Sequence, residues 1–324
     1  MKTDLVHFIG ADVHKSTTTF TVLNREQNVM DVACIPTRIP LLRTYLEGIQ
    51  GPKGLIFEEM GLSQWLYAML RPCVDECIVC DPYRNHLLKE GAKTDPIDSQ
   101  KLATLYLHQL IKPIFHSTHR LMDLRNQVHV YQETVRASVR AQNQYEAYLA
   151  KNGIDTKSKT FCDTLDLQLQ REHIVFLERQ KRKILEQWKC KRKTIPQIAL
   201  LTSIEGIGLV GAFIILAAVV DPKRFSSKHA FWSYCGLAKH PRQSGERIYG
   251  YTNTRYHRDL KNVFKRAAVI SIGMKNGILR KVYDQLRKQG IAEHNARNAI
   301  ARKIAAISLA CLKQKRRFDP NQLI

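Results

Sequence analysis

Acidic residues are scarce in this chain of 324 residues, with 29 Asp and Glu against 51 Lys and Arg, a formal net charge of +22. An excess of one sign this large favours a polyanionic partner. Nucleic acid is the first candidate, because neutralising its phosphates releases counterions and drives binding. An anionic membrane surface is the second candidate.

A long hydrophobic run is also missing. The longest, residues 206–220, is shorter than a membrane span and is closed by Asp221, so it predicts a buried helix. Asp4 and His7 interrupt the first residues and no small-residue cleavage site follows, which argues against a signal peptide. We therefore expect no membrane partner and a cytosolic location.

The chain has no complete zinc-ligand pattern. Its eight cysteines are scattered, which suits a reducing cytosol. Cys73, Cys77 and Cys80 are spaced as zinc ligands can be, but no second His/Cys cluster of suitable spacing completes a site. The run from Cys77 to Cys80 predicts a buried strand instead.

Three domains are predicted from the order of the patterns. Residues 1–115 alternate strand and helix signals, which indicates an α/β domain. Residues 116–195 hold two helical stretches with apolar seams, typical of an antiparallel coiled-coil spacer. Residues 196–324 predict a mainly α-helical domain, with helices at 225–237 and 293–312 and a polar turn at 240–247.

The second spacer helix carries charges of almost one sign on one side. This face predicts dimerisation or contact with nucleic acid, the alternative being a solvated charged face. The candidate nucleic-acid contacts are Lys181, Arg182, Lys183, Lys191 and Arg192. Gly206 and Gly208 resemble the turn of a helix-hairpin-helix, where backbone N–H groups reach a phosphate, but tight helix packing explains such glycines equally well.

Four carboxylates recur at places where strands end or helices begin. Asp12 lies between two apolar runs, Glu58 ends a predicted strand, and Asp95 and Asp98 flank Pro96, with Asp95 as the expected helix cap. Taken singly, Asp12 is explained equally well as a turn aspartate, and Asp95 and Asp98 as helix-capping residues. Taken together, they predict a Mg²⁺ site, since Mg²⁺ prefers oxygen ligands. Glu59 competes with Glu58, but strand neighbours face opposite ways and we prefer Glu58.

The ordered motifs resemble those of a known family. Gly10-x-Asp12-Val13-His14-Lys15, Phe57-Glu58-x-x-Gly61 and Lys93-Thr94-Asp95-x-x-Asp98 look like the Asp-Glu-Asp-Asp tetrad of a family of insertion-sequence transposases that includes the Piv-type DNA invertases. The likeness continues through residues 204–208, 224–226, 234–237 and 243–245, and so covers nearly the whole chain. The family commonly has a basic residue followed by Gly-Asn downstream, and residues 253–258 lack that glycine.

This resemblance implies an RNase H/RuvC-like fold for the first domain and a DNA recombinase activity. Asp12, Glu58, Asp95 and Asp98 would hold Mg²⁺, and Ser244, otherwise a turn serine, would attack a DNA phosphate and form a phosphoserine link. A homo-oligomer (a dimer or tetramer) and a structured guide RNA are further implied partners. Lys15, Lys93, Arg242 and Arg247 adjoin these residues and are expected to contact nucleic acid.

Three other functions compete with this reading. A hydrolytic nuclease of the junction-resolvase kind would use the same carboxylates with water as nucleophile. A phosphotransferase of the sugar-kinase fold would need a Gly-Thr phosphate loop where His14 and Lys15 stand. A nucleic-acid-binding protein without catalysis would not need four carboxylates.

Overall fold

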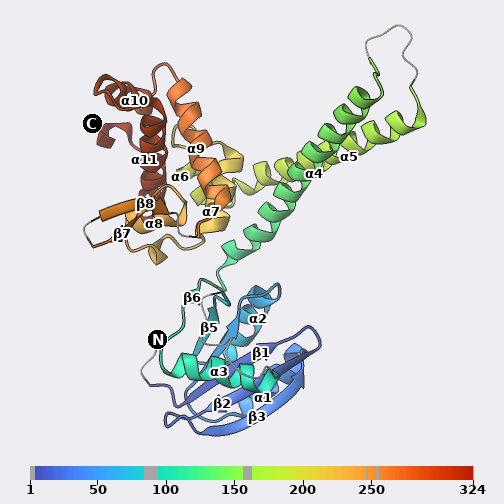
Figure 1. Ribbon diagram of the computed structural model, residues 1–324, viewed down its shortest axis with the longest axis vertical. Coiled ribbons are helices and arrows are strands. Elements are labelled where there is room, and N and C mark those ends of the chain that lie inside the picture. Colours follow the sequence, from blue (N-terminus) through green and yellow to red (C-terminus); the bar gives the residue numbers. More distant parts are fainter. Residues whose placement is uncertain (1–3, 84–93, 156–162, 246, 253–254, 324) are drawn as a thin grey trace. The chain divides into compact units, whose positions relative to one another are not determined.

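The computed structural model describes residues 4–83, 94–155, 163–245, 247–252 and 255–323. Contacts between Cα atoms divide the chain into two compact units, Met1–His119 and Arg120–Ile324. Lys93 is outside the described residues. The first unit is an α/β domain and the second is built mostly of helices (Figure 1).

The first unit is organised around a six-stranded sheet in the order β3-β2-β1-β4-β5-β6. Its first three strands form an antiparallel meander, β4 and β5 continue parallel to β1, and β6 closes the edge antiparallel to β5. This arrangement is consistent with the expected RNase H-like fold. The strands are β1 His7–Val13, β2 Thr17–Leu23, β3 Val29–Pro36, β4 Lys53–Glu58, β5 Glu76–Cys80 and β6 Pro113–Ile114.

Helices cover both faces of this sheet. Helices α1 (Ile39–Gly48) and α2 (Ser63–Leu70) pack on one face and bury the larger core. Helix α3 (Asp95–Leu107) covers the other face with Leu102, Leu105 and Tyr106. Cys77 and Cys80 belong to these two separate cores, as the predicted buried strand requires, and their thiols cannot converge on one metal ion.

The second unit begins with a hairpin of two long helices, α4 (Asp123–Lys151) and α5 (Leu165–Lys191), preceded by the short turn η3 (Arg120–Met122). The Ser138 hydroxyl donates to the Glu178 carboxylate at 2.7 Å, and Lys191 Nζ donates to Gln127 Oε1 at 2.8 Å. The first contact joins the middles of the two helices and the second joins the start of α4 to the end of α5, so the two helices are antiparallel. At that end Trp188 is fully buried and stacks on Phe213, with ring centroids 4.4 Å apart.

The rest of the unit packs around two helices that bury many of their side chains. They are α7 (Leu209–Val219), the buried helix predicted for the apolar run, and α11 (Glu293–Gln314). The remaining elements are α6 Pro196–Leu201, η4 Pro222–Arg224, α8 Lys228–Tyr234, α9 Arg258–Gly273, α10 Ile278–Lys288 and η5 Pro320–Leu323. Within the described part of the chain, no helix combines the length and the hydrophobicity needed to cross a membrane.

The polar segment at 240–247 differs from its prediction as a turn. It forms most of a β-hairpin in which β7 (His240–Ser244) pairs with β8 (Arg247–Thr252). The second strand contains Ile248, Tyr249 and Tyr251, residues that favour extended backbone. Gly245 supplies the positive φ of +58° that a tight hairpin turn needs. The predicted helix at 225–237 is also shorter and is confined to α8.

Candidate metal and catalytic site

Asp12 lies on the face of β1 that α3 covers. Ile9, Ala11 and Val13 belong to the core under α1 and α2, so the alternation of a strand turns Gly10 and Asp12 to the opposite face. A Cβ atom on Gly10 would lie 2.0 Å from the backbone oxygen of Ser99 and 2.6 Å from the backbone nitrogen of Ala103. Helix α3 therefore rests directly on β1, and only glycine permits this approach.

The first turn of α3 carries the other two aspartates. The N-cap is Thr94, in extended backbone conformation, and Asp95 is the first helical residue, so the prediction of Asp95 as the cap is wrong by one position. Two hydroxyls fasten this turn to the sheet, because Thr21 Oγ1 lies 2.7 Å from Ser99 Oγ, and Ser99 Oγ donates to the Pro96 carbonyl at 3.0 Å. Thr21 is paired with Gly10 in the sheet, so the aspartates of α3 are held beside β1.

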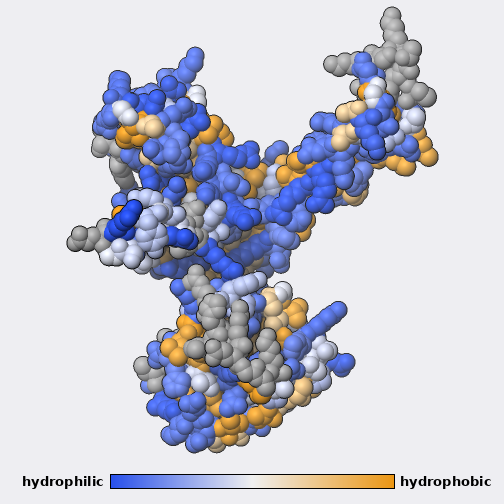
Figure 2. Space-filling model, in the orientation of Figure 1, coloured by the Kyte–Doolittle hydropathy of each residue, from blue (hydrophilic) through white to orange (hydrophobic). Residues whose placement is uncertain are grey.

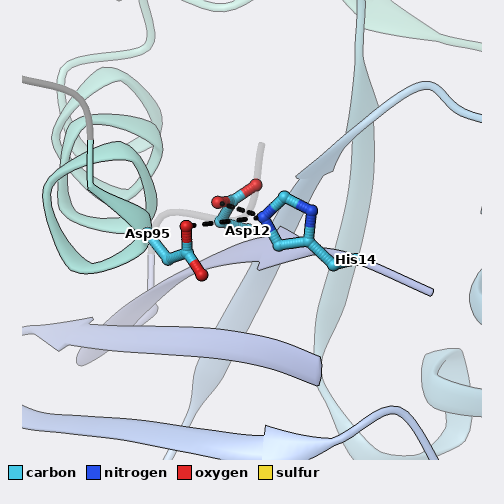
Figure 3. A group of neighbouring side chains, drawn as sticks. All are labelled: Asp12, His14 and Asp95. Atoms are coloured by element: carbon cyan, nitrogen blue, oxygen red, sulfur yellow. Dashed lines mark hydrogen bonds and ion pairs between the residues drawn. The ribbon is translucent and has the colours of Figure 1, made fainter. Parts of the chain in front are cut away.

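Asp12 and Asp95 converge on one histidine. His14 Nε2 lies 3.2 Å from Asp12 Oδ2 and 3.5 Å from Asp95 Oδ1, and Figure 3 shows the imidazole directed at both carboxylates. One ligand atom from each of the three residues lies within 4.8 Å of the others. His14 was not a site residue in the sequence reading. The sequence did contain an indication of this role, because residues two positions apart in an extended chain point to the same side, and His14 is two positions after Asp12.

The electrostatics of Asp12 show that negative charge is concentrated here. Burial is the main cause of a raised pKa of Asp12, and the nearby charges of Asp95 and Asp98 raise this pKa further, against the opposing effect of His14. Asp98 lies 3.8 Å from the ammonium of Lys101, measured from Oδ1 to Nζ. A cation near Asp12 would offset both the burial and the repulsion.

Glu58 shares the side of the sheet that carries Asp12. Phe57 is paired with Ala11 in the parallel ladder and points into the core under α1 and α2. Glu58 is the next residue of the strand, so its side chain points to the opposite face, which α3 covers. The neighbouring Glu59 is exposed and forms an ion pair with the buried His116, with 3.1 Å between Oε2 and Nε2. Of the two glutamates, Glu58 is therefore the one that faces the same side of the sheet as Asp12.

The donor set fits a hard divalent cation. Asp12, Glu58, Asp95 and Asp98 offer carboxylate oxygens, the ligands that Mg²⁺ takes in proteins. The structure brings Asp12 and Asp95 within reach of one ion, and it places Glu58 and Asp98 on the same side of the sheet.

Ser244 lies at the tip of the β7–β8 hairpin in the second unit. It is exposed, ends β7 and pairs with Arg247 across the turn, and Gly245 follows it. The Gln243 side chain donates to the Gly245 carbonyl at 2.6 Å and braces the turn. Arg242 and Arg247 are exposed on either side, so the hydroxyl stands in open, basic surroundings.

Two family models match the chain in succession. A model of DEDD transposases of the IS110 type matches residues 9–152, which include the four carboxylates. A model described as "Transposase IS116/IS110/IS902 family" matches residues 198–284, which include Ser244. The chain belongs to the IS110-type transposase family.

Curated relatives of the family match a smaller part of the chain. The pilin gene-inverting protein of Moraxella bovis is 29% identical over 133 residues, 40% of this chain and 41% of that protein. An uncharacterised 44.8 kDa protein of insertion element IS116 from Streptomyces clavuligerus is 30% identical over 129 residues, 40% of this chain and 32% of that protein. The pilin gene-inverting protein of Moraxella lacunata is 30% identical over 124 residues. The chain thus spans well under half the length of these relatives.

The basic candidates of this transposase-family chain fall into two groups. Two of them are bonded to other residues of the α4–α5 hairpin: Lys181 Nζ donates to Glu178 at 2.5 Å, and Lys191 Nζ donates to Gln127 at 2.8 Å. Six are exposed: Lys15, Arg182, Lys183, Arg192, Arg242 and Arg247. The second group is the one able to meet a phosphate.

The two glycines between α6 and α7 have different surroundings. Gly206 has a φ of +85°, and a Cβ there would lie 2.2 Å from the Ala267 carbonyl oxygen, so close packing on α9 requires this glycine. Gly208 is the exposed N-cap of α7, with open space where a Cβ would be. Gly208 is therefore the one of the two that leaves room for a phosphate.

Proposed function

We propose that this chain is a DNA transposase or recombinase that cuts and rejoins strands with a Mg²⁺-binding tetrad and a serine nucleophile. The observation that carries the proposal is the convergence of Asp12 and Asp95 beside His14, on the face of the sheet that also receives Glu58 and Asp98. Burial, with the added repulsion of Asp95 and Asp98, raises the pKa of Asp12, so a bound cation would favour the ionised carboxylate.

In this proposal the four carboxylates hold Mg²⁺, and bound Mg²⁺ supplies charge stabilisation for the attacking and leaving oxygens of phosphoryl transfer. The chain's own residues do the positioning. Gly10 lets α3 rest on β1, and Thr21 fastens the first turn of α3, so that Asp95 stays beside Asp12. Exposed cations, Lys15 among them, are suited to holding the DNA backbone.

Ser244 is the proposed nucleophile. A bond forms between Ser244 Oγ and a DNA phosphorus while the bond from that phosphorus to the leaving sugar oxygen breaks. The hydroxyl proton passes to a base or solvent, and the leaving oxygen gains a proton. Attack of a free DNA hydroxyl on the phosphoserine reverses these steps and rejoins a strand. The exposure of Ser244 and the glycine after it support this role, because a DNA backbone needs room to approach.

We also infer that the chain acts as a homo-oligomer, a dimer or tetramer, with α4 and α5 as a coiled-coil contact. Figure 2 shows hydrophobic residues on the surface of the outer part of this hairpin. Those of α5 are more than half exposed: Leu165, Leu169, Val175 and Phe176. Contiguous exposed apolar side chains favour an interface. A structured guide RNA is a further proposed partner, supported by the net charge of +22, and a DNA substrate would place the protein at the nucleoid.

The deciding experiment is a search for a protein–DNA adduct on a denaturing gel. The chain is co-expressed with its native flanking DNA, so that any guide RNA is present, and is then given Mg²⁺ and element-end DNA. We expect an adduct in the wild type and in Thr44→Ala, which removes an exposed hydroxyl from α1 on the other face of the sheet. We expect no adduct in Ser244→Ala or Asp12→Asn.

The alternative function is a RuvC-like nuclease with water as nucleophile, which the same carboxylates would support. That enzyme would cleave DNA without an adduct, and Ser244→Ala would cleave as well as the wild type. This outcome would refute the serine mechanism while keeping the metal site. Persistence of the adduct in Asp12→Asn would instead refute the role of the tetrad.

A further inference from the structure

A groove of about 690 Å³ lies between α8 and the C-terminal half of α11 in the second unit. The two helices lie side by side in the second unit (Figure 1). One wall is the indole of Trp232, whose Nε1 donates to the Arg302 carbonyl at 2.8 Å, and small or aliphatic side chains of α11, Ala310 among them, form the floor. Because its N–H is already bonded, Trp232 offers the groove an apolar ring.

The charged groups that line this groove are all cations. They are Lys228, Arg302, Lys303 and Lys313, and no Asp or Glu is among the described lining residues. Lys313 Nζ donates to the Phe225 carbonyl at 2.6 Å, which holds it at the groove. Among the residues that the structure describes, no carboxylate forms an ion pair with Lys228, Arg302 or Lys303.

An apolar floor, one aromatic wall and a cationic rim suit an unpaired nucleotide. Unpaired bases stack on aromatic side chains whatever their sequence, and nearby cations follow the backbone phosphates. A duplex keeps its bases stacked inside and would meet the cations but leave the floor empty. The groove's volume of about 690 Å³ leaves room for a base.

We propose that this groove binds a single-stranded segment of DNA, with a base against Trp232 and its phosphates at the cationic rim. The inference rests on the proposed function for the choice of DNA, because a cut strand that is joined to a new partner leaves its complement unpaired. It adds a site on a different part of the chain from the tetrad and from Ser244.

The test uses a matched pair of charge substitutions in the full chain. Ala310 is exposed in the groove, and Ala147 is exposed on α4 away from it. Ala310→Glu and Ala147→Glu change the net charge equally. Affinity is measured by fluorescence anisotropy with a labelled 20-nucleotide oligothymidine and with a duplex of equal length. Excess EDTA is present, so that no cleavage occurs and the result does not depend on catalysis.

We expect Ala310→Glu to weaken oligothymidine binding by about tenfold, within the range that loss of one stacked base covers, and to change duplex binding by less than about threefold. Ala147→Glu should leave the ratio of the two affinities unchanged. Lys228→Gln should weaken oligothymidine binding and lower its salt dependence, relative to Lys288→Gln at the end of α10.

Equal losses for both probes in Ala310→Glu, or no loss for oligothymidine, would overturn the proposal. So would an oligouridine RNA that binds more tightly than the DNA and shows the same dependence on Ala310, because the occupant would then be RNA. Failure of the adduct experiment, with the discrimination by Ala310→Glu intact, would refute the recombination chemistry and leave this binding site standing.

Discussion

Replacing Gly10 with alanine should separate α3 from the sheet. The new Cβ would lie 2.0 Å from the Ser99 oxygen and 2.6 Å from the Ala103 nitrogen, both of them backbone atoms of α3 that no rotamer change can move. The helix must shift by about 1 Å or more before the contacts become tolerable. Overpacking of this kind costs about 1–3 kcal/mol. For a unit of about 120 residues, that cost lowers Tm by roughly 4–12 °C.

The assay is differential scanning calorimetry of the whole chain without divalent metal, beside Gly48→Ala as control. Gly48 ends α1, and a Cβ there meets nothing within 4 Å. Its replacement should leave Tm unchanged or raise it slightly, because alanine restricts the unfolded chain more than glycine does. A Gly10→Ala protein that melts within about 1 °C of the wild type would refute the direct packing of α3 on β1.

Three further perturbations test other parts of the structure. Because the pKa of Asp12 is raised on folding, ionisation of Asp12 destabilises the folded state as the pH rises through that pKa. Asp12→Asn should therefore raise the metal-free Tm at pH 7, and this gain in Tm should vanish below about pH 3.8. Calorimetry at a series of pH values measures both effects. Glu58→Gln should weaken Mg²⁺ binding, followed by isothermal titration, by at least about tenfold, whereas Glu59→Gln should change it less than about threefold; equal effects would contradict the assignment. Trp188→Ala removes the ring that stacks on Phe213 and should cost about 3–5 kcal/mol in urea unfolding, and a cost below about 1 kcal/mol would show that the hairpin does not depend on this contact.

The elements that were predicted correctly are those with a clear hydrophobic pattern. The strand that ends at Glu58, the strand at 77–80 and the buried helix within the run 206–220 are confirmed, because each has a buried run bounded by polar residues or by glycine. Asp12 and Asp95 were chosen as partners from their positions beside a strand end and at a helix start, together with the order of the motifs, and the structure brings them to one histidine.

Other features depend on contacts between distant segments. Gly10 was part of a motif, but its role follows from the arrival of α3, some ninety positions later in the chain. The β7–β8 hairpin was taken for a turn because Pro241, Ser244 and Gly245 are turn-forming residues, and its first strand has no hydrophobic alternation. The two roles of Glu58 and Glu59 were separable in advance by strand alternation, but the buried partner of Glu59, His116, was not.

The alternation of β1 has a consequence for how this gene can change in length. Ile9, Ala11 and Val13 point into one core while Gly10 and Asp12 face α3, so the side on which Asp12 emerges is fixed by counting from Ile9. Inserting or deleting one residue between them would turn the carboxylate into the apolar core. A change of two residues would restore the side but displace the carboxylate by about 6.6 Å along the strand. We therefore expect in-frame insertions to be excluded from this strand. They should be tolerated in a turn such as residues 24–28 between β2 and β3, because the pairing of these strands does not depend on the number of residues in the turn.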